Sequence, residues 1–200
     1  MSLTKKSNLT KFAKIILVLI AIILLAGCND KENTTTNNNS NSNTNSNTTS
    51  EKVTSKAQTE PIEISESDIA GMEKLNCSRE GSAGSNTEVN LNYELYYQGD
   101  YLQILHSTEQ IITEAEDTLD EYENAYHSIY LNYQDLDYYD TAIIRTSNSV
   151  TNDTVINYGK IDTDKLLEIE GEEDNVIKDG KVKLQDWLDF AEQFGTTCEE

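Results

Sequence analysis

Residues 88–105 read EVNLNYELYYQGDYLQIL, and this stretch decides the fold. From Val89 to Tyr97, large apolar or aromatic residues alternate with mostly polar ones, and a period of two predicts a half-buried β-strand. The segment Gln98-Gly99-Asp100 follows, with glycine at the first central position of a type II′ hairpin turn. Residues 101–105 are again β-rich. The stretch therefore predicts an antiparallel hairpin.

Helical periodicity begins beyond the hairpin. Leucine, isoleucine and tyrosine recur at helical spacing from Leu119 to Tyr133 with acidic residues between them, which predicts an amphipathic helix with an acidic outer face. Two β-rich runs follow at 138–145 and 150–158, and a second amphipathic helix is expected from Leu184 to Phe194. A short strand is expected near residues 75–77.

The elements show no strand–helix–strand alternation. We therefore expect an α+β domain whose antiparallel sheet has about four to five strands and is packed by two amphipathic helices.

Short motifs accompany this pattern. They are Tyr96-Tyr97-Gln98-Gly99-Asp100, Tyr158-Gly159-Lys160-Ile161-Asp162, the tyrosine-rich helix, and a last helix that closes on Phe194-Gly195. Together they resemble the YehR-type bacterial lipoproteins over residues 72–197. The resemblance implies a small α+β domain behind a lipid anchor. It supplies no catalytic residue, because the family has no assigned activity.

The amino end reads as a targeting signal. Residues 1–14 carry four lysines and no acidic residue, and the run from Ile15 to Ala26 is entirely apolar. This run is shorter than the ~20 residues that a membrane-spanning helix needs, but it fits the apolar region of a signal peptide. The sequence Leu25-Ala26-Gly27-Cys28 resembles the lipobox of bacterial lipoproteins. That resemblance implies a signal peptide at 1–27, lipidation of Cys28, and attachment through Cys28 to the outer face of a bacterial cell membrane.

A polar segment separates the anchor from the domain. Residues 29–60 include 9 Asn, 8 Thr and 5 Ser, too little apolar surface to offset the entropy of ordering. We expect residues 28–60 to be the lipidated cysteine and a disordered tether, and residues 61–200 to form one acidic extracytoplasmic domain.

The composition excludes some classes of partner. The chain has 36 Asp and Glu against 15 Lys and Arg, a formal net charge of -21. Nucleic-acid binding depends on basic residues that neutralise phosphates, so no nucleic acid is expected as a partner. The signatures of serine hydrolases, zinc peptidases and P-loop proteins are absent from the sequence, and no cofactor is expected.

With Cys28 lipidated, Cys77 and Cys198 remain. An even pair in an oxidising compartment predicts a disulfide, and the alternative is two free thiols.

Acidic clusters occur at 114–123 and 170–174, and solvated charge is their default interpretation. Asn175, Asp179, Gly180 and Asp186 match four positions of a calcium loop, but Ile177 replaces a required oxygen ligand, so no metal site is expected. His106 and His127 are expected to be packed or surface side chains. Tyr96 and Tyr138 are the candidates for an exposed aromatic surface, since they lie on the polar faces of their strands.

These observations favour a membrane-anchored, non-enzymatic module that binds a protein or a small molecule. A deep pocket with convergent polar groups and a strongly perturbed carboxyl would argue against this interpretation. The alternatives are a module that responds to divalent cations and a cell-wall hydrolase with an unrecognised pair of carboxylates.

Overall fold

The computed structural model describes residues 57–84, 86–172 and 175–199. Its centre is the predicted hairpin, formed by β2 (Glu88–Gln98) and β3 (Tyr101–Ile112). Gly99 takes a φ of +57° in the turn, the left-handed conformation that glycine adopts without steric cost. The hairpin prediction is confirmed.

The sheet extends on both sides of this hairpin. Its main order is β4-β5-β3-β2-β1-β8, with β1 at Glu73–Ser82, β4 at Tyr139–Arg145, β5 at Ser149–Asn157 and β8 at Thr197–Glu199. Two short strands, β6 (Ile177–Lys178) and β7 (Lys181–Lys183), form a hairpin that continues from the start of β3. All pairings between these strands are antiparallel.

The α+β class is confirmed, but the predicted number of elements is wrong. The described residues form eight strands and three helices, namely α3 (Glu116–Tyr133), α4 (Thr163–Leu167) and α5 (Leu184–Glu192). The missing elements have two to five residues each, too short to show a periodicity. Within the described ranges, no helix is long and apolar enough to cross a membrane.

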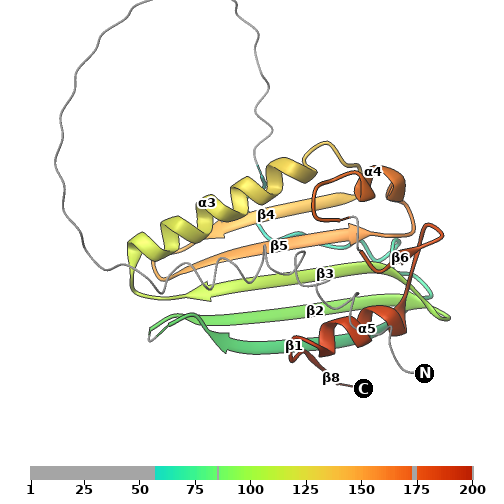
Figure 1. Cartoon of the computed structure of the whole chain (residues 1–200), viewed down its shortest axis with the longest axis horizontal. Coiled ribbons are helices and arrows are strands. Elements are labelled where there is room, and N and C mark those ends of the chain that lie inside the picture. Colours follow the sequence, from blue (N-terminus) through green and yellow to red (C-terminus); the bar gives the residue numbers. More distant parts are fainter. Residues whose placement is uncertain (1–56, 85, 173–174, 200) are drawn as a thin grey trace, which may run out of the picture.

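Both long helices lie on the same face of the sheet (Figure 1). Leu119, Tyr122 and Tyr126 of α3 pack on Ile111 of β3 and Ile143 of β4. Trp187 and Ala191 of α5 belong to a second apolar cluster, which contains Leu95, Leu105 and Leu166. The helix-covered face therefore has two apolar centres, one below each helix.

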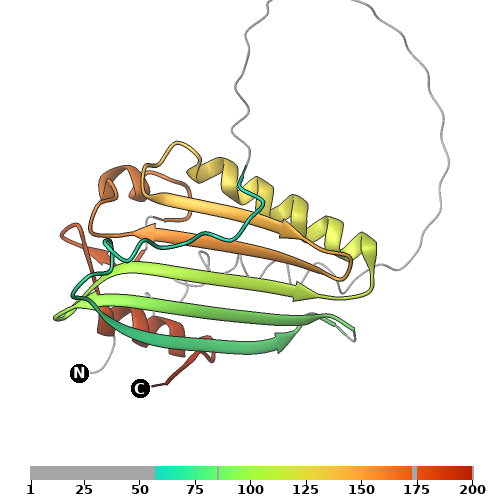
Figure 2. The same cartoon turned by 180° about the vertical axis from the view of Figure 1, so that it is seen from behind.

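The opposite face is covered by an extended segment, residues 57–72, here called the N-terminal strap (Figure 2). Gln58 pairs with β4, donating its N–H to the Thr141 carbonyl at 3.2 Å and accepting from the Ile143 N–H at 2.8 Å. Farther along, Ile62, Ile64, Ile69 and Met72 pack on Tyr96, Ile104 and Val155 of the sheet. Ala57, which is buried, and Gln58, which is paired with β4, show that described residues before Pro61 also contact the sheet.

Candidate functional site

A cavity of about 310 Å³ lies on the helix-covered face of the sheet, with α3 and α5 among its walls. Strands β1, β2, β3 and β5 contribute residues to its floor. Residues 170–172 and 175–176, in the loop that follows α4, also line it. Its volume falls at the lower end of the range typical of small-molecule sites.

One row of side chains across the sheet supplies the polar groups of this cavity. The strand registers place Arg79 opposite Leu91, Leu91 opposite Glu109, and Glu109 opposite Asn152. Residues directly opposite one another in a sheet project from the same face. Arg79, Glu109 and Asn152 come from β1, β3 and β5, and the register brings all three to one cavity.

Glu109 is the unusual member of this row. Only 8% of the residue is exposed, and burial raises the pKa of its carboxyl from 4.5 to about 7, although Arg79 and the Tyr126 hydroxyl both act in the opposite direction. Among the described residues no ion pair within 4 Å engages the carboxyl, and its contact with the Tyr126 hydroxyl falls short of hydrogen-bond geometry. A buried carboxyl without an ion-pair partner is costly and is characteristic of functional sites.

A second buried acceptor lies beside Glu109. The Asn152 side-chain oxygen has no hydrogen-bond partner among the described residues. The Tyr122 and Tyr126 hydroxyls, on the adjacent part of α3, also lack one. Most buried polar atoms in proteins are paired, so the unpaired oxygen of Asn152, which lines the cavity, indicates room for a further molecule; Tyr122 and Tyr126 are not among the lining residues.

Aromatic side chains form the wall nearest α3 and β4. Tyr133 and Tyr139 stack with centroids 4.3 Å apart and ring planes 8° apart, and the Tyr133 hydroxyl donates to Glu172 at 2.5 Å. Glu172 also accepts from the Asn175 amide. Burial, with the Glu172 charge added, raises the pKa of Tyr133, Tyr139 and Tyr158, so these phenols stay neutral.

The wall nearest α5 is aromatic as well. Trp187 meets Tyr93 edge to face with centroids 5.2 Å apart, and Phe190 meets Phe194 at 5.4 Å. Burial raises the pKa of Tyr93 to about 12, with the Glu109 charge contributing. Arg79 crosses to this wall, where its Nη1 donates to the Phe194 carbonyl at 3.1 Å.

The predicted disulfide is present. Cys77 in β1 and Cys198 in β8 are directly opposite one another and bonded, and they are 121 positions apart in the sequence. The bond holds β8 against β1, directly after the segment that carries Phe194. Cys28, the predicted lipidation site, lies outside the described residues, as do the predicted signal peptide and most of the predicted tether.

The two tyrosines predicted to form an aromatic surface behave differently. Tyr138 is 49% exposed, with a φ of +68° and Lys160 above its ring. Tyr96 is only 7% exposed, so the prediction of an exposed ring is wrong there. The N-terminal strap covers its side of the sheet, and its hydroxyl donates to Glu94 at 2.8 Å.

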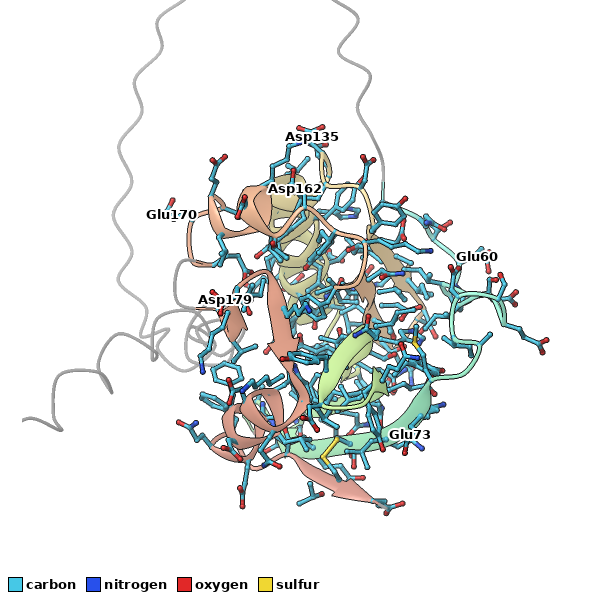
Figure 3. The ribbon with its side chains drawn as sticks, turned by 90° about the vertical axis from the view of Figure 1, so that its right-hand side faces the viewer. Glu60, Glu73, Asp135, Asp162, Glu170 and Asp179 are labelled. Carbon is cyan, nitrogen blue, oxygen red and sulfur yellow. A yellow bond between two sulfur atoms is a disulfide. The ribbon has the colours of Figure 1, made fainter. Side chains whose placement is uncertain are left out.

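The acidic residues of the 114–123 cluster are exposed or partly exposed, whereas Glu173 and Asp174 of the second cluster lie outside the described residues. Glu60, Glu73, Asp135, Asp162, Glu170 and Asp179 all project outward from the domain (Figure 3). The calcium-loop resemblance has another structural origin, because Asp179 and Gly180 form the turn between β6 and β7, both with positive φ. Asp186 is bound to Lys178 at 2.6 Å. No group of three or more potential ligands that could hold a metal occurs among the described residues.

His106 belongs to a polar network below the N-terminal strap. Its Nε2 lies 2.6 Å from Asp153, and its Nδ1 lies 3.6 Å from Glu94. The second oxygen of Asp153 accepts from the Ile62 N–H of the strap at 2.8 Å. His127 is at the surface of α3, 4.0 Å from Glu123. Each histidine lies beside a carboxylate, and neither lines the cavity.

Glu109 and Arg79 were not among the functional residues predicted from the sequence. A signal for Glu109 was available, since the period of two that turns Leu105 and Ile111 toward the core turns Glu109 the same way. A charged residue at a strand position whose side chain points into the core is unusual, and it is therefore a candidate for a functional role. The partnership with Arg79 and Asn152 depends on the strand order and has no local signature.

Comparison with known proteins gives distant structural matches. The solved structures similar to this chain include the NMR structure of Escherichia coli YehR, with 13% identity over 64% of this chain and 92% of that chain and a TM-score of 0.47. They also include an NMR structure of a Streptococcus pneumoniae TIGR4 protein, with 12% identity over 78% of this chain and 100% of that chain and a TM-score of 0.46. No protein-family model and no curated protein matches the sequence. No property of either neighbour is transferred to this chain.

Proposed function

We propose that this chain is a membrane-anchored extracytoplasmic module that binds a small molecule in the cavity between α3 and α5. The observation that carries the proposal is Glu109, a buried carboxyl with a raised pKa and no ion pair within 4 Å among the described residues, which lines an aromatic cavity of about 310 Å³. Small-molecule sites are typically concave and mainly apolar, with a few polar groups that orient the ligand. The described residues bring these features together in one place.

The anchor belongs to the same proposal. It depends on the lipobox resemblance at Leu25-Ala26-Gly27-Cys28, since lipidation of Cys28 would hold the domain at the outer face of a bacterial membrane. Metabolic labelling with a tagged fatty acid tests it. The wild-type chain should incorporate the label and fractionate with membranes, and the Cys28→Ala variant should do neither. Equal labelling of the variant would contradict the anchor.

The cavity contains its own fluorescent reporter, because Trp187 is the chain's single tryptophan and lines the site. Titration of small aromatic fragments into the full-length chain should change its emission with saturation. Ser107→Phe places a bulky ring in the cavity floor and should abolish the response. Gln110→Phe is the matched control on the opposite face of the same strand, and it should bind as the wild type does. Equal responses from both variants would contradict binding in the cavity.

A second candidate function is acid–base catalysis. The raised pKa of Glu109, about 7, gives a carboxyl that can donate and accept protons near neutral pH, as general acids and bases do. This property departs from a purely non-enzymatic interpretation and favours the hydrolase alternative over the cation-responsive one. Turnover of purified peptidoglycan by the wild type, lost in Glu109→Gln, would support it. Absence of turnover in the wild type would leave binding as the function.

A further inference from the structure

We propose that the cavity selects a ligand with a protonated amine, which the Glu109 carboxylate and the Asn152 side-chain oxygen receive between aromatic walls. The inference rests on the proposed function and specifies its ligand. It depends on which charges line the cavity, which of them are already occupied, and which polar atoms lack a partner.

The charge balance of the cavity favours a cation. Glu109 and Glu172 line it, against a single basic residue, Arg79. Glu170 also belongs to the lining, but it is exposed and projects outward. Arg79 already donates from Nη1 to the Phe194 carbonyl. An anionic ligand would therefore meet a surplus of carboxyls at short range, where repulsion in a partly desolvated site is strong.

The hydrogen-bonding groups that remain free are acceptors. Glu172 accepts from both Tyr133 and Asn175, so its oxygens are already engaged. Glu109 has no ion pair within 4 Å among the described residues, and the oxygen of its neighbour Asn152 is buried without a donor. An ammonium group has three donors and no acceptor, which suits two adjacent acceptors. An apolar ligand would leave both of them buried and unpaired, at a cost in affinity.

The walls suit the same class of ligand. Seven aromatic residues line the cavity, contributed by β2, α3, β4, α5 and the segments that follow β5 and α5: Tyr93, Tyr133, Tyr139, Tyr158, Trp187, Phe190 and Phe194. Aromatic rings attract cations through their quadrupole, and the effect grows when water is excluded. They also provide apolar surface for the carbon skeleton of an amine. We therefore expect an amphipathic amine rather than a small inorganic cation.

The test compares three probes of similar size that differ in charge: phenethylammonium, phenethyl alcohol and phenylacetate. Each is titrated into the full-length chain at pH 8 and followed by Trp187 fluorescence. Phenethylammonium should bind most tightly. Glu109→Gln should weaken its binding by about tenfold or more, because a hydrogen bond to a charged group is lost. It should leave phenethyl alcohol almost unchanged. Glu80→Gln, an exposed substitution in β1, is the matched control and should change neither affinity.

A pH series adds a readout that a structural role would not produce. Phenethylammonium should bind more weakly at pH 6 than at pH 8, because protonation of Glu109 removes its charge, and this dependence should disappear in Glu109→Gln. The charged and titratable groups near Glu109 are Arg79 from β1, Tyr93 from β2, and Tyr122 and Tyr126 from α3. Burial raises the pKa of all three tyrosines, so Glu109 is the one of these groups expected to titrate in this interval. His106 also has a raised pKa, but it lies on the opposite face of the sheet, beside Asp153.

The outcomes separate this inference from the proposed function. If the alcohol or the acid binds as tightly as the ammonium, or if Glu109→Gln leaves the ammonium affinity unchanged, the selectivity is refuted. Binding in the cavity then still stands, provided that Ser107→Phe abolishes the response. If no probe binds the wild type, or if Ser107→Phe binds every probe normally, both proposals are refuted. Circular dichroism of each variant confirms that it is folded.

Discussion

Removal of the Glu109 charge should stabilise the protein at alkaline pH. The native carboxyl has a pKa of about 7, against an ordinary value of 4.5. Between these two values the native state binds more protons than the unfolded chain, so stability falls as pH rises through this interval. The difference corresponds to about 3 kcal/mol once pH exceeds 7. Glu109→Gln has no ionisable group at this position and should avoid this loss.

The assay is urea unfolding of the wild type and of Glu109→Gln at pH 5 and pH 8, followed by Trp187 fluorescence. At pH 5 the two proteins should differ little, because the wild-type carboxyl is already protonated in the native state. At pH 8 the variant should be more stable by up to about 3 kcal/mol, which is roughly 10 °C in melting temperature for a domain of this size. Glu80→Gln should follow the wild-type profile.

A variant that is less stable than the wild type at pH 8 would refute this reasoning. It would mean that the Arg79 guanidinium stabilises the ionised carboxyl more than burial destabilises it, and that Glu109 is a structural ion-pair partner. A variant equally stabilised at both values of pH would also refute it, because the gain would then come from packing and not from charge.

Three further predictions concern other parts of the molecule. Bonding to Asp153, with the nearby Glu94 charge, raises the pKa of His106 above 6.5, so its stabilising contribution is complete below pH 6.5 and is lost as pH rises through the raised value. His106→Gln should therefore lower the urea midpoint at pH 6 and have a smaller effect at pH 9, and an equal effect at both would contradict this origin. Replacement of Cys77 and Cys198 by alanine should cost about 4–5 kcal/mol in unfolding free energy on the chain-entropy model, since the bond closes a loop of 121 positions, and an unchanged urea midpoint would contradict it. Calcium and magnesium at matched ionic strength should shift the melting temperature equally, through screening alone, whereas a saturable shift specific to calcium and reversed by a chelator would indicate a cation site.

The sequence was informative wherever a periodic pattern was long. The hairpin at 88–105, the helix around Tyr126 and the helix around Trp187 all follow from spacing, because one face of each is buried continuously. Strand β1 extends over ten residues although only a short strand near 75–77 was expected. Its second half contains Arg79, Glu80 and Gly81, and the arginine that lines the cavity interrupts the apolar alternation on which the prediction depends.

Contacts between segments that are distant in the sequence could not be predicted from periodic patterns. Tyr96 lies on the face of its strand that the alternating sequence pattern marks as polar. That position is buried only because the N-terminal strap crosses over it. The cavity is a similar case, because Glu109 acquires its neighbours through a register that joins β1, β2, β3 and β5. Cysteine pairing was the exception, since the number of cysteines and the expected compartment restrict the choice without any geometry.

The N-terminal strap also determines how the domain would respond to mechanical force. A pull transmitted along the chain toward Ala57 first loads the two backbone hydrogen bonds of Gln58 at β4 and then the bond from Ile62 to Asp153. These few bonds can fail in sequence, whereas β1 lies between β2 and β8 and is joined to β8 through Cys77–Cys198. Tension would therefore peel the strap from the sheet and lengthen the connection to the domain before it disturbs β1, β2 or the cavity on the other face.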